Sequence, residues 1–159
     1  MNALAVLGLR IFLVLLFAGA LFAQIVMIPL TGFDISEFYP KRGYLEVPYI
    51  VLGILAVACG QVAIVAVWAL LSRVRRGAIF TPSAFRWVDV IIWCGVIATA
   101  LVASVEVNAI VIENIGSPAI LILLTSAVIA GGAFVLLMIV MRGLLRSATT
   151  LQSELEEVV

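Results

Sequence analysis

The chain has 159 residues, of which 65% are hydrophobic and 11% charged; its formal net charge is zero and it contains no histidine. Soluble domains have roughly 45 to 50% apolar and about 25% charged residues, so this composition excludes a water-soluble fold. Without histidine the chain lacks the commonest general base and metal ligand, and without a basic stripe it is poorly suited to bind nucleic acid directly. Cys59 and Cys94 stand alone in apolar runs, so we expect packing residues and no cofactor.

Four apolar runs, each long enough to cross a bilayer, follow one another within a single domain covering residues 1–159. We place the spans at about 8–29, 47–72, 87–112 and 117–142, with an outer loop at 31–46, an inner loop at 73–86 and a tail at 143–159. The first run also resembles a signal peptide, but it continues to Pro29, so we expect a retained anchor. The sequence therefore predicts an all-α integral membrane protein, a four-transmembrane-helix up-and-down bundle with a cytoplasmic C-terminal helical extension.

The basic residues are distributed unevenly between the two sides of the predicted membrane. Lys41 and Arg42 fall on one side, and the other side carries Arg10, Arg73, Arg75, Arg76, Arg86, Arg142 and Arg146. Short cytoplasmic loops carry an excess of lysine and arginine, so we expect both termini and the inner loop in the cytoplasm.

Polar residues inside the spans are the ligand-binding candidates: Glu106, Gln24, Gln61 and Asn108. A carboxylate in hydrocarbon costs several kcal/mol unless it faces a polar interior or takes up a proton, so Glu106 is the first suspect. Glu106 and Gln24 are each roughly 9 Å from the outer helix ends and could meet, whereas Asn108 faces almost opposite to Glu106 and Gln61 lies deeper. As an alternative, Glu106 lies at the outer end of its helix and is solvated by water. The alternative for the two glutamines is that they form hydrogen bonds between helices.

Small residues at four-residue spacing predict where helices approach closely, because packing in lipid depends on short side chains. Such ridges are Ala56, Gly60 and Ala63 in the second span, Gly95, Thr99 and Ala103 in the third, and Ala127 and Gly131 in the fourth. The spacing leaves open whether the contacts form within one chain or in a homo-oligomer.

The cytoplasmic face holds the partner-binding candidates. Thr81 is a suitable N-cap and Pro82 suits a first helical turn, so a helix should start there. Apolar residues recur every three or four positions from Leu144 to Val158, which predicts an amphipathic helix in the tail. The candidates are Arg73, Arg75, Arg76, Phe80, Arg86, Leu151, Glu154 and Leu155. The alternatives are that the arginines serve topology and bind lipid headgroups, and that the tail packs on its own bundle.

Two cytoplasmic segments, RRGAIFTPSAFRWV (75–88) and LLRSATTLQSELEEVV (144–159), resemble those of a family of small bacterial four-helix membrane proteins, domain-of-unknown-function family 2975. The chain shares the stretch Gly77, Ile79, Phe80 and Thr81. In family members an asparagine follows this stretch, whereas this chain has Ser83 or Ala84 there. Its closing residues also differ from those of the family. Members are often encoded beside a small helix-turn-helix regulator. The resemblance thus implies the bacterial cytoplasmic membrane and a cytoplasmic helix-turn-helix partner, and it supplies no catalytic residues.

Two functions are compatible with these features. The leading hypothesis is a non-enzymatic bacterial inner-membrane protein, an interaction or regulatory partner that works through its cytoplasmic face. The alternative is a ligand-binding or permeation protein centred on Glu106, with lipid, a small hydrophobic compound, a cation or a proton as the ligand.

Overall fold

The computed structural model describes residues 3–30, 46–74, 82–112 and 118–157, and these form helices throughout. Helix α1 (Ala3–Phe22) leads into the π-helical turn η1 (Ala23–Met27), and α3 covers Glu46–Val74. Helix α4 (Pro82–Val107) leads into a second π-helical turn, η3 (Asn108–Ile112), and α5 covers Pro118–Glu157. Helix α4 starts at Pro82, as its sequence predicts. The outer loop lies outside the described residues, apart from Glu46, and so do residues 75–81 of the inner loop.

Four helices are long and apolar enough to cross a membrane: Val6–Leu30, Val47–Ser72, Phe85–Ile110 and Ile120–Thr150. Large apolar side chains are exposed on all of them; Ile25, Trp93 and Ile122, for example, are each at least 65% exposed. A soluble protein would bury such groups, whereas lipid solvates them. The helical fold and the multi-pass membrane character predicted from the sequence are therefore confirmed.

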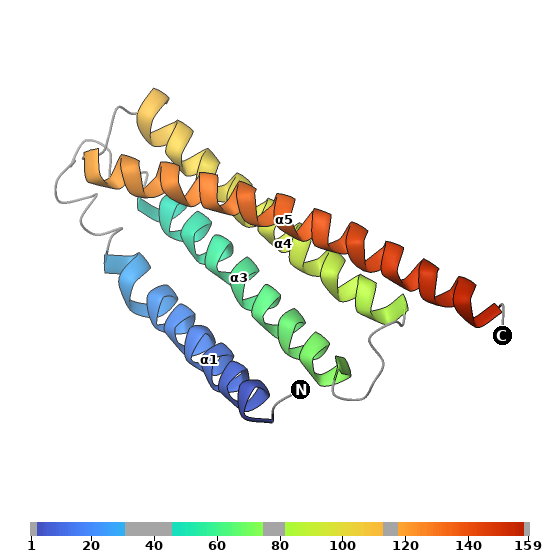
Figure 1. The fold of residues 1–159 in the computed structure, drawn as a ribbon. Helices are drawn as coiled ribbons and strands as arrows, with labels where there is room; N and C mark the ends of the chain where they lie inside the picture. Colours follow the sequence, from blue (N-terminus) through green and yellow to red (C-terminus); the bar gives the residue numbers. More distant parts are fainter. Residues whose placement is uncertain (1–2, 31–45, 75–81, 113–117, 158–159) are drawn as a thin grey trace.

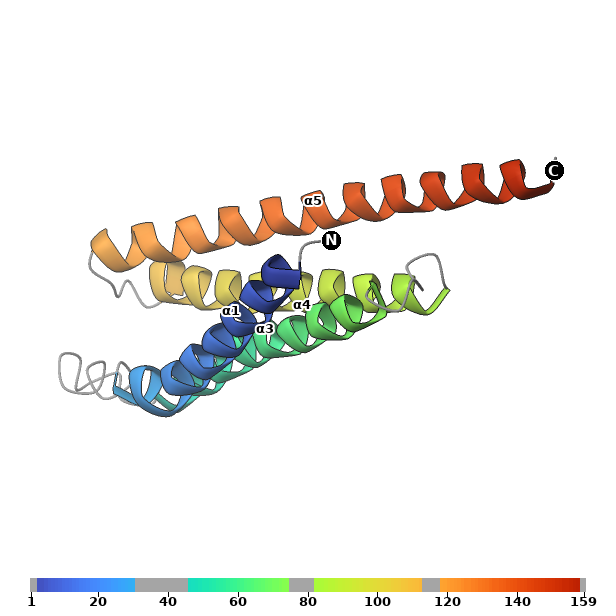
Figure 2. The same cartoon turned by 60° about the horizontal axis from the view of Figure 1, so that its bottom comes forward.

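Each helix packs on the next one in the sequence, with α1 on α3, α3 on α4 and α4 on α5. Successive helices run in opposite directions (Figure 1). Within the described residues α1 and α5 do not form a packed pair, so the row of helices is not closed into a ring. Figure 2 shows α5 standing apart from most of α1. We call the end where α1 and α4 begin and α3 ends the basic end, and the opposite one the far end.

Helices α4 and α5 approach closely at glycines. A Cβ added to Gly131 would overlap Thr99 Oγ1, and one added to Gly95 would lie 2.9 Å from Val135 Cγ2. The Thr99 hydroxyl donates to the Gly95 carbonyl at 2.8 Å, so it is satisfied within its own helix. The contacts predicted for Gly95, Thr99 and Gly131 are thus confirmed, and they form within one chain.

The contact predicted for Gly60 is not formed in this chain. A Cβ at Gly60 would meet nothing within 4 Å, whereas one at Gly53 would lie 3.4 Å from Ile28 Cγ2. Helix α3 therefore comes close to the first span at Gly53, and Gly60 faces open space. Four-residue spacing of small residues is frequent in a chain this rich in alanine and glycine, so spacing alone did not identify the packed face.

Gly131→Ala should destabilise the α4–α5 crossing, because its methyl group would overlap the Thr99 hydroxyl and force the helices apart. Overpacking of this kind costs about 1 to 3 kcal/mol. Gly132→Ala is the matched control, since a Cβ there meets nothing within 4 Å. Thermal unfolding in detergent should show a lower midpoint for Gly131→Ala only; equal midpoints for the two variants would contradict this packing.

Candidate functional site

Gln24 and Gln61 form a polar pair between the first span and α3. Gln61 Nε2 donates to Gln24 Oε1 at 2.8 Å, and Gln24 Nε2 donates to the Ile54 carbonyl at 3.1 Å. Ile54 and Gln61 are two turns apart on the same face of α3, so Gln24 bridges both turns. Gln24 lies in η1, where the Ile28 N–H donates to the Ala23 carbonyl five residues earlier. The pair fits the interhelical hydrogen bonding that was the alternative to a ligand role.

Asn108 is positioned by the second π-helical turn, at the far end of α4. Its Oδ1 accepts a hydrogen bond from Tyr49 Oη at 2.8 Å, which joins η3 to the start of α3. π-helical turns are uncommon and frequently occur at functional sites, and the two within the described residues each carry an amide side chain that joins two helices. Sequence periodicity gave no signal for either turn.

Glu106 lies on the other side of α4 and accepts a hydrogen bond from the Thr125 hydroxyl of α5. Because α4 packs between α3 and α5, Glu106 and Asn108 point to opposite neighbours, as the sequence predicted. The side chain of Glu106 is partly exposed. The structure therefore does not gather the four candidate polar residues into one site. Gln24 pairs with Gln61, whereas Asn108 bonds to α3 and Glu106 bonds to α5.

An ion pair that sequence reasoning missed joins α4 and α5 at the basic end. Arg142 Nε lies 2.7 Å from Asp89 Oδ1, and Arg142 Nη2 donates to Asp89 Oδ2 at 3.1 Å. This two-point geometry fixes the orientation of both groups, although both side chains are more than a third exposed. The available signal was Asp89, an acidic residue near the start of the third span, on the side of the membrane that carries most of the arginines.

Arg10 and Trp68 form a second contact at the basic end, between α1 and α3. The Arg10 Cζ atom lies 5.6 Å from the centre of the Trp68 ring, within the range of a cation–π interaction. Arg10 Nε is enclosed and has no hydrogen-bond partner in the described part of the chain.

The predicted partner-binding residues are only partly covered by the structure. Arg86 is exposed on α4, Arg73 lies in the last turn of α3, and Leu151, Glu154 and Leu155 lie in α5. Arg75, Arg76 and Phe80 lie outside the described residues. Their role in binding stays a prediction.

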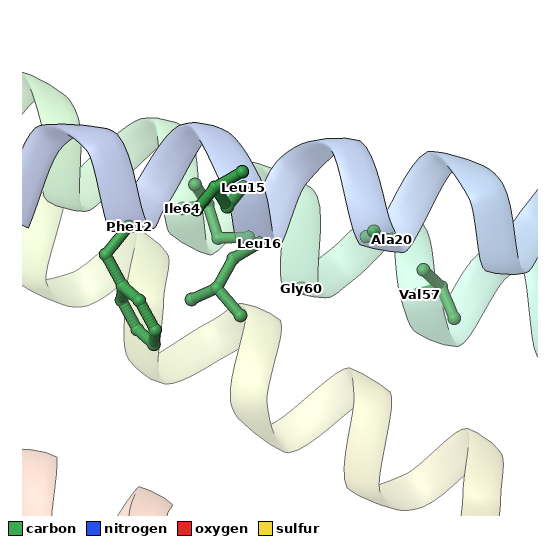
Figure 3. Close-up of a pocket in the computed structure, with 8 residues that line it drawn as sticks. Phe12, Leu15, Leu16, Ala20, Val57, Gly60 and Ile64 are labelled. Atoms are coloured by element: carbon green, nitrogen blue, oxygen red, sulfur yellow. The ribbon is translucent and has the colours of Figure 1, made fainter.

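Two open apolar grooves flank the contact between α1 and α3. The first has a volume of about 510 Å³, and Figure 3 shows its lining by Phe12, Leu15, Leu16 and Ala20 of α1 and by Val57, Gly60 and Ile64 of α3. The second has a volume of about 410 Å³ and is lined by Leu13, Val14, Phe17, Ala18, Leu21, Ile64, Val65 and Trp68. Neither groove contains Glu106 or a glutamine.

The chemistry available to the described residues is limited. No group of three or more histidine, cysteine, aspartate or glutamate side chains among them is arranged to hold a metal ion. Cys59 and Cys94 are free thiols, both half-buried. The arrangement provides polar contacts between helices, an ion pair that joins α4 to α5 at the basic end, and apolar grooves.

These features define a helical membrane protein in which four candidate spans pack in sequence order. The chain belongs to the family described as Protein of unknown function (DUF2975), whose model matches residues 30–159. The match thus covers α3, α4 and α5 and begins at the last residues of the first span. The family resemblance found in residues 75–88 and 144–159 is thereby confirmed. No curated protein and no solved structure matches the chain.

The Gln24–Gln61 bond predicts a non-additive pair of substitutions. Either Gln24→Leu or Gln61→Leu leaves one amide without its partner, which should cost about 0.5 to 2 kcal/mol. The double variant removes both amides, so it should be destabilised by less than the sum of the single changes. Unfolding in mixed detergent micelles measures this coupling, and strictly additive effects would show that the pair does not form.

Arg142→Gln should lower the thermal midpoint in detergent by a few degrees, because it releases Asp89 and the base of the α5 extension. Partly exposed ion pairs contribute at most about 1 kcal/mol. Exchanging the two charges, with Asp89→Arg and Arg142→Asp together, should recover part of the loss. Arg146→Gln, one turn further along α5, is the control for loss of charge alone; an equal effect there would argue against a specific pair.

Proposed function

We propose that this protein is a non-enzymatic interaction or regulatory partner in the bacterial cytoplasmic membrane. Its working element is the part of α5 beyond Arg142, which we place in the cytoplasm by the arginine bias at the basic end. The partner is a cytoplasmic protein, and a helix-turn-helix regulator is the first candidate because the family resemblance implies one.

The observation that carries this proposal is the length of α5. It is a single helix of 40 residues, about 60 Å at 1.5 Å per residue, whereas the hydrocarbon core of a bilayer is about 30 Å thick. Its C-terminal part extends beyond the start of α4 (Figures 1 and 2). The helix is thus about twice as long as the hydrocarbon core is thick, and its C-terminal part, which carries Arg142 and Arg146, would present a surface to water.

One face of the described part of the extension is open. Arg146, Ser147 and Ala148 are exposed and Leu144 is 62% exposed, whereas Leu145 and Thr149 are partly covered. The open face supports the partner-binding alternative for the segment up to Thr150. An apolar residue repeated every three or four positions on an exposed helix suits a partner groove.

The Asp89–Arg142 pair lies about two turns from the start of α4, at the base of the extension. It joins α5 to α4 through two contacts with one carboxylate, so the direction of the extension depends on how α4 and α5 are packed. This is the connection through which a change within the membrane would reach a cytoplasmic partner.

The alternative, ligand binding or permeation centred on Glu106, has one observation in its favour. The carboxylate lies on the α4–α5 seam, where it bonds to Thr125 and is partly exposed. A transport site gathers several polar groups at one depth, whereas the candidate residues here bond to different helices. We therefore rank this alternative second.

Affinity capture from the native membrane tests the leading proposal. Detergent-solubilised full-length protein should retain a soluble protein that a version truncated after Arg146 loses. The apolar stripe is tested by the double variant Leu151→Glu and Leu155→Glu, which should release the partner. Gln152→Glu with Ser153→Glu adds the same charge to other faces of the helix and should leave capture unchanged.

Glu106→Gln separates the two functions, since it removes the charge and retains an acceptor for Thr125. It should leave partner capture unchanged if the leading proposal is correct. If the version truncated after Arg146 still captures the partner, the tail is not part of the interface. If no protein is captured, and a small molecule that copurifies with the wild type is lost with Glu106→Gln, the interaction proposal fails.

A further inference from the structure

We call the second of the two grooves the α1–α3 trough, and it ends at a cation. The trough is lined by Leu13, Val14, Phe17, Ala18, Leu21, Ile64, Val65 and Trp68. Its lining contains aliphatic and aromatic side chains only. Trp68 closes it towards the basic end, and the Arg10 guanidinium lies 5.6 Å from the centre of that ring. Arg10 precedes Leu13 by about one helical turn, so the charge lies in line with the trough along α1.

The charge of Arg10 lacks an anionic partner in the part of the chain that the structure describes. Its guanidinium lies over the Trp68 ring, and its Nε has no hydrogen-bond partner among the described residues. A guanidinium carries five N–H donors in a planar fork that matches phosphate oxygens. An unneutralised guanidinium at the edge of the hydrocarbon region attracts anionic lipid headgroups.

We propose that the α1–α3 trough binds one anionic phospholipid from the leaflet at the basic end. An acyl chain lies along the trough, and the phosphate accepts hydrogen bonds from the terminal nitrogens of Arg10. This inference is independent of the proposed function of α5, because it involves different helices and no residue of the tail.

The dimensions fit one leaflet. From Leu13 to Leu21 the trough follows α1 for about 12 Å, and each leaflet contributes about 15 Å to the hydrocarbon core. Trp68 lies at the level where indole rings are enriched, between hydrocarbon and headgroups. The chain thus supplies an apolar wall, an interfacial ring and a cation in the order in which a phospholipid presents its acyl chain, glycerol region and phosphate.

The other occupant to consider is a helix of a second copy. The trough is lined by Phe17, Leu21 and Trp68, whereas close helix contacts in lipid use small residues. The other groove holds Gly19, Ala20 and Gly60, and a Cβ at either glycine would meet nothing within 4 Å. If copies associate through α1 and α3, that other groove is the better surface, which leaves the trough for lipid.

Native mass spectrometry of the full-length protein in detergent tests the proposal, with phosphatidylglycerol and phosphatidylcholine of identical acyl chains as probes. Wild type should prefer phosphatidylglycerol by about fivefold, the preference that one arginine near a membrane surface confers. Arg10→Gln should abolish this preference, and Arg10→Lys should retain part of it. Inorganic phosphate at millimolar concentration should not compete, because it has no acyl chain.

Two alanines of α1 provide a matched pair for the apolar part of the site. Ala18 lines the trough and Ala20 lines the other groove. Ala18→Phe should reduce binding of both phospholipids severalfold, and Ala20→Phe should leave it unchanged. Size-exclusion elution and helical circular dichroism check that each variant is folded.

Three results would overturn the proposal. The first is equal binding of the two phospholipids by wild type, and the second is an unchanged preference in folded Arg10→Gln. The third is a dimer that Ala18→Phe dissociates and Ala20→Phe does not, which would place a second copy in the trough.

Discussion

A polar side chain in hydrocarbon has no water to bond, and this constraint explains how the helices of this protein are joined. Gln24 bonds to Gln61 and to the Ile54 carbonyl, Asn108 accepts from Tyr49, and Glu106 accepts from Thr125. Each of these bonds connects two helices that are adjacent in the packing order. Because lipid removes the hydrophobic drive for association, such bonds and close packing at glycine are what remains to hold the row together.

The helices are not attached equally. Helix α4 is central, since it packs on α3 along one side and crosses α5 closely at Gly95, Thr99 and Gly131. The first span is held to α3 by the Gln24–Gln61 pair in η1 and the Arg10–Trp68 contact in α1, with an open apolar groove on each side. The family match covers the three helices that pack most closely and begins where the first span ends. The surface of α1 is therefore where lipid has most access to the protein.

Both proposals concern the basic end of the protein, but each rests on a different helix there. At α5 the important property is what extends away from the membrane: a helix fixed at its base by Asp89 and Arg142 and exposed beyond it. At α1 the important property is a surface that accepts what the membrane itself supplies, an acyl chain and an anionic headgroup. A partner on α5 and a lipid on α1 would each bind without displacing the other, since α1 and α5 do not form a packed pair in the described residues.

The sequence by itself determined the helical membrane class, the four candidate spans and the start of α4 at Pro82, because hydropathy and capping are local properties. Regular helical geometry also placed Glu106 and Asn108 on opposite sides of α4. Only the tertiary structure decided that Gln24 meets Gln61, that Gly60 faces open space, and that Asp89 pairs with Arg142. Those outcomes depend on helix tilt, on the π-helical turns and on which faces meet, and none of these is encoded in the spacing of residues along one helix.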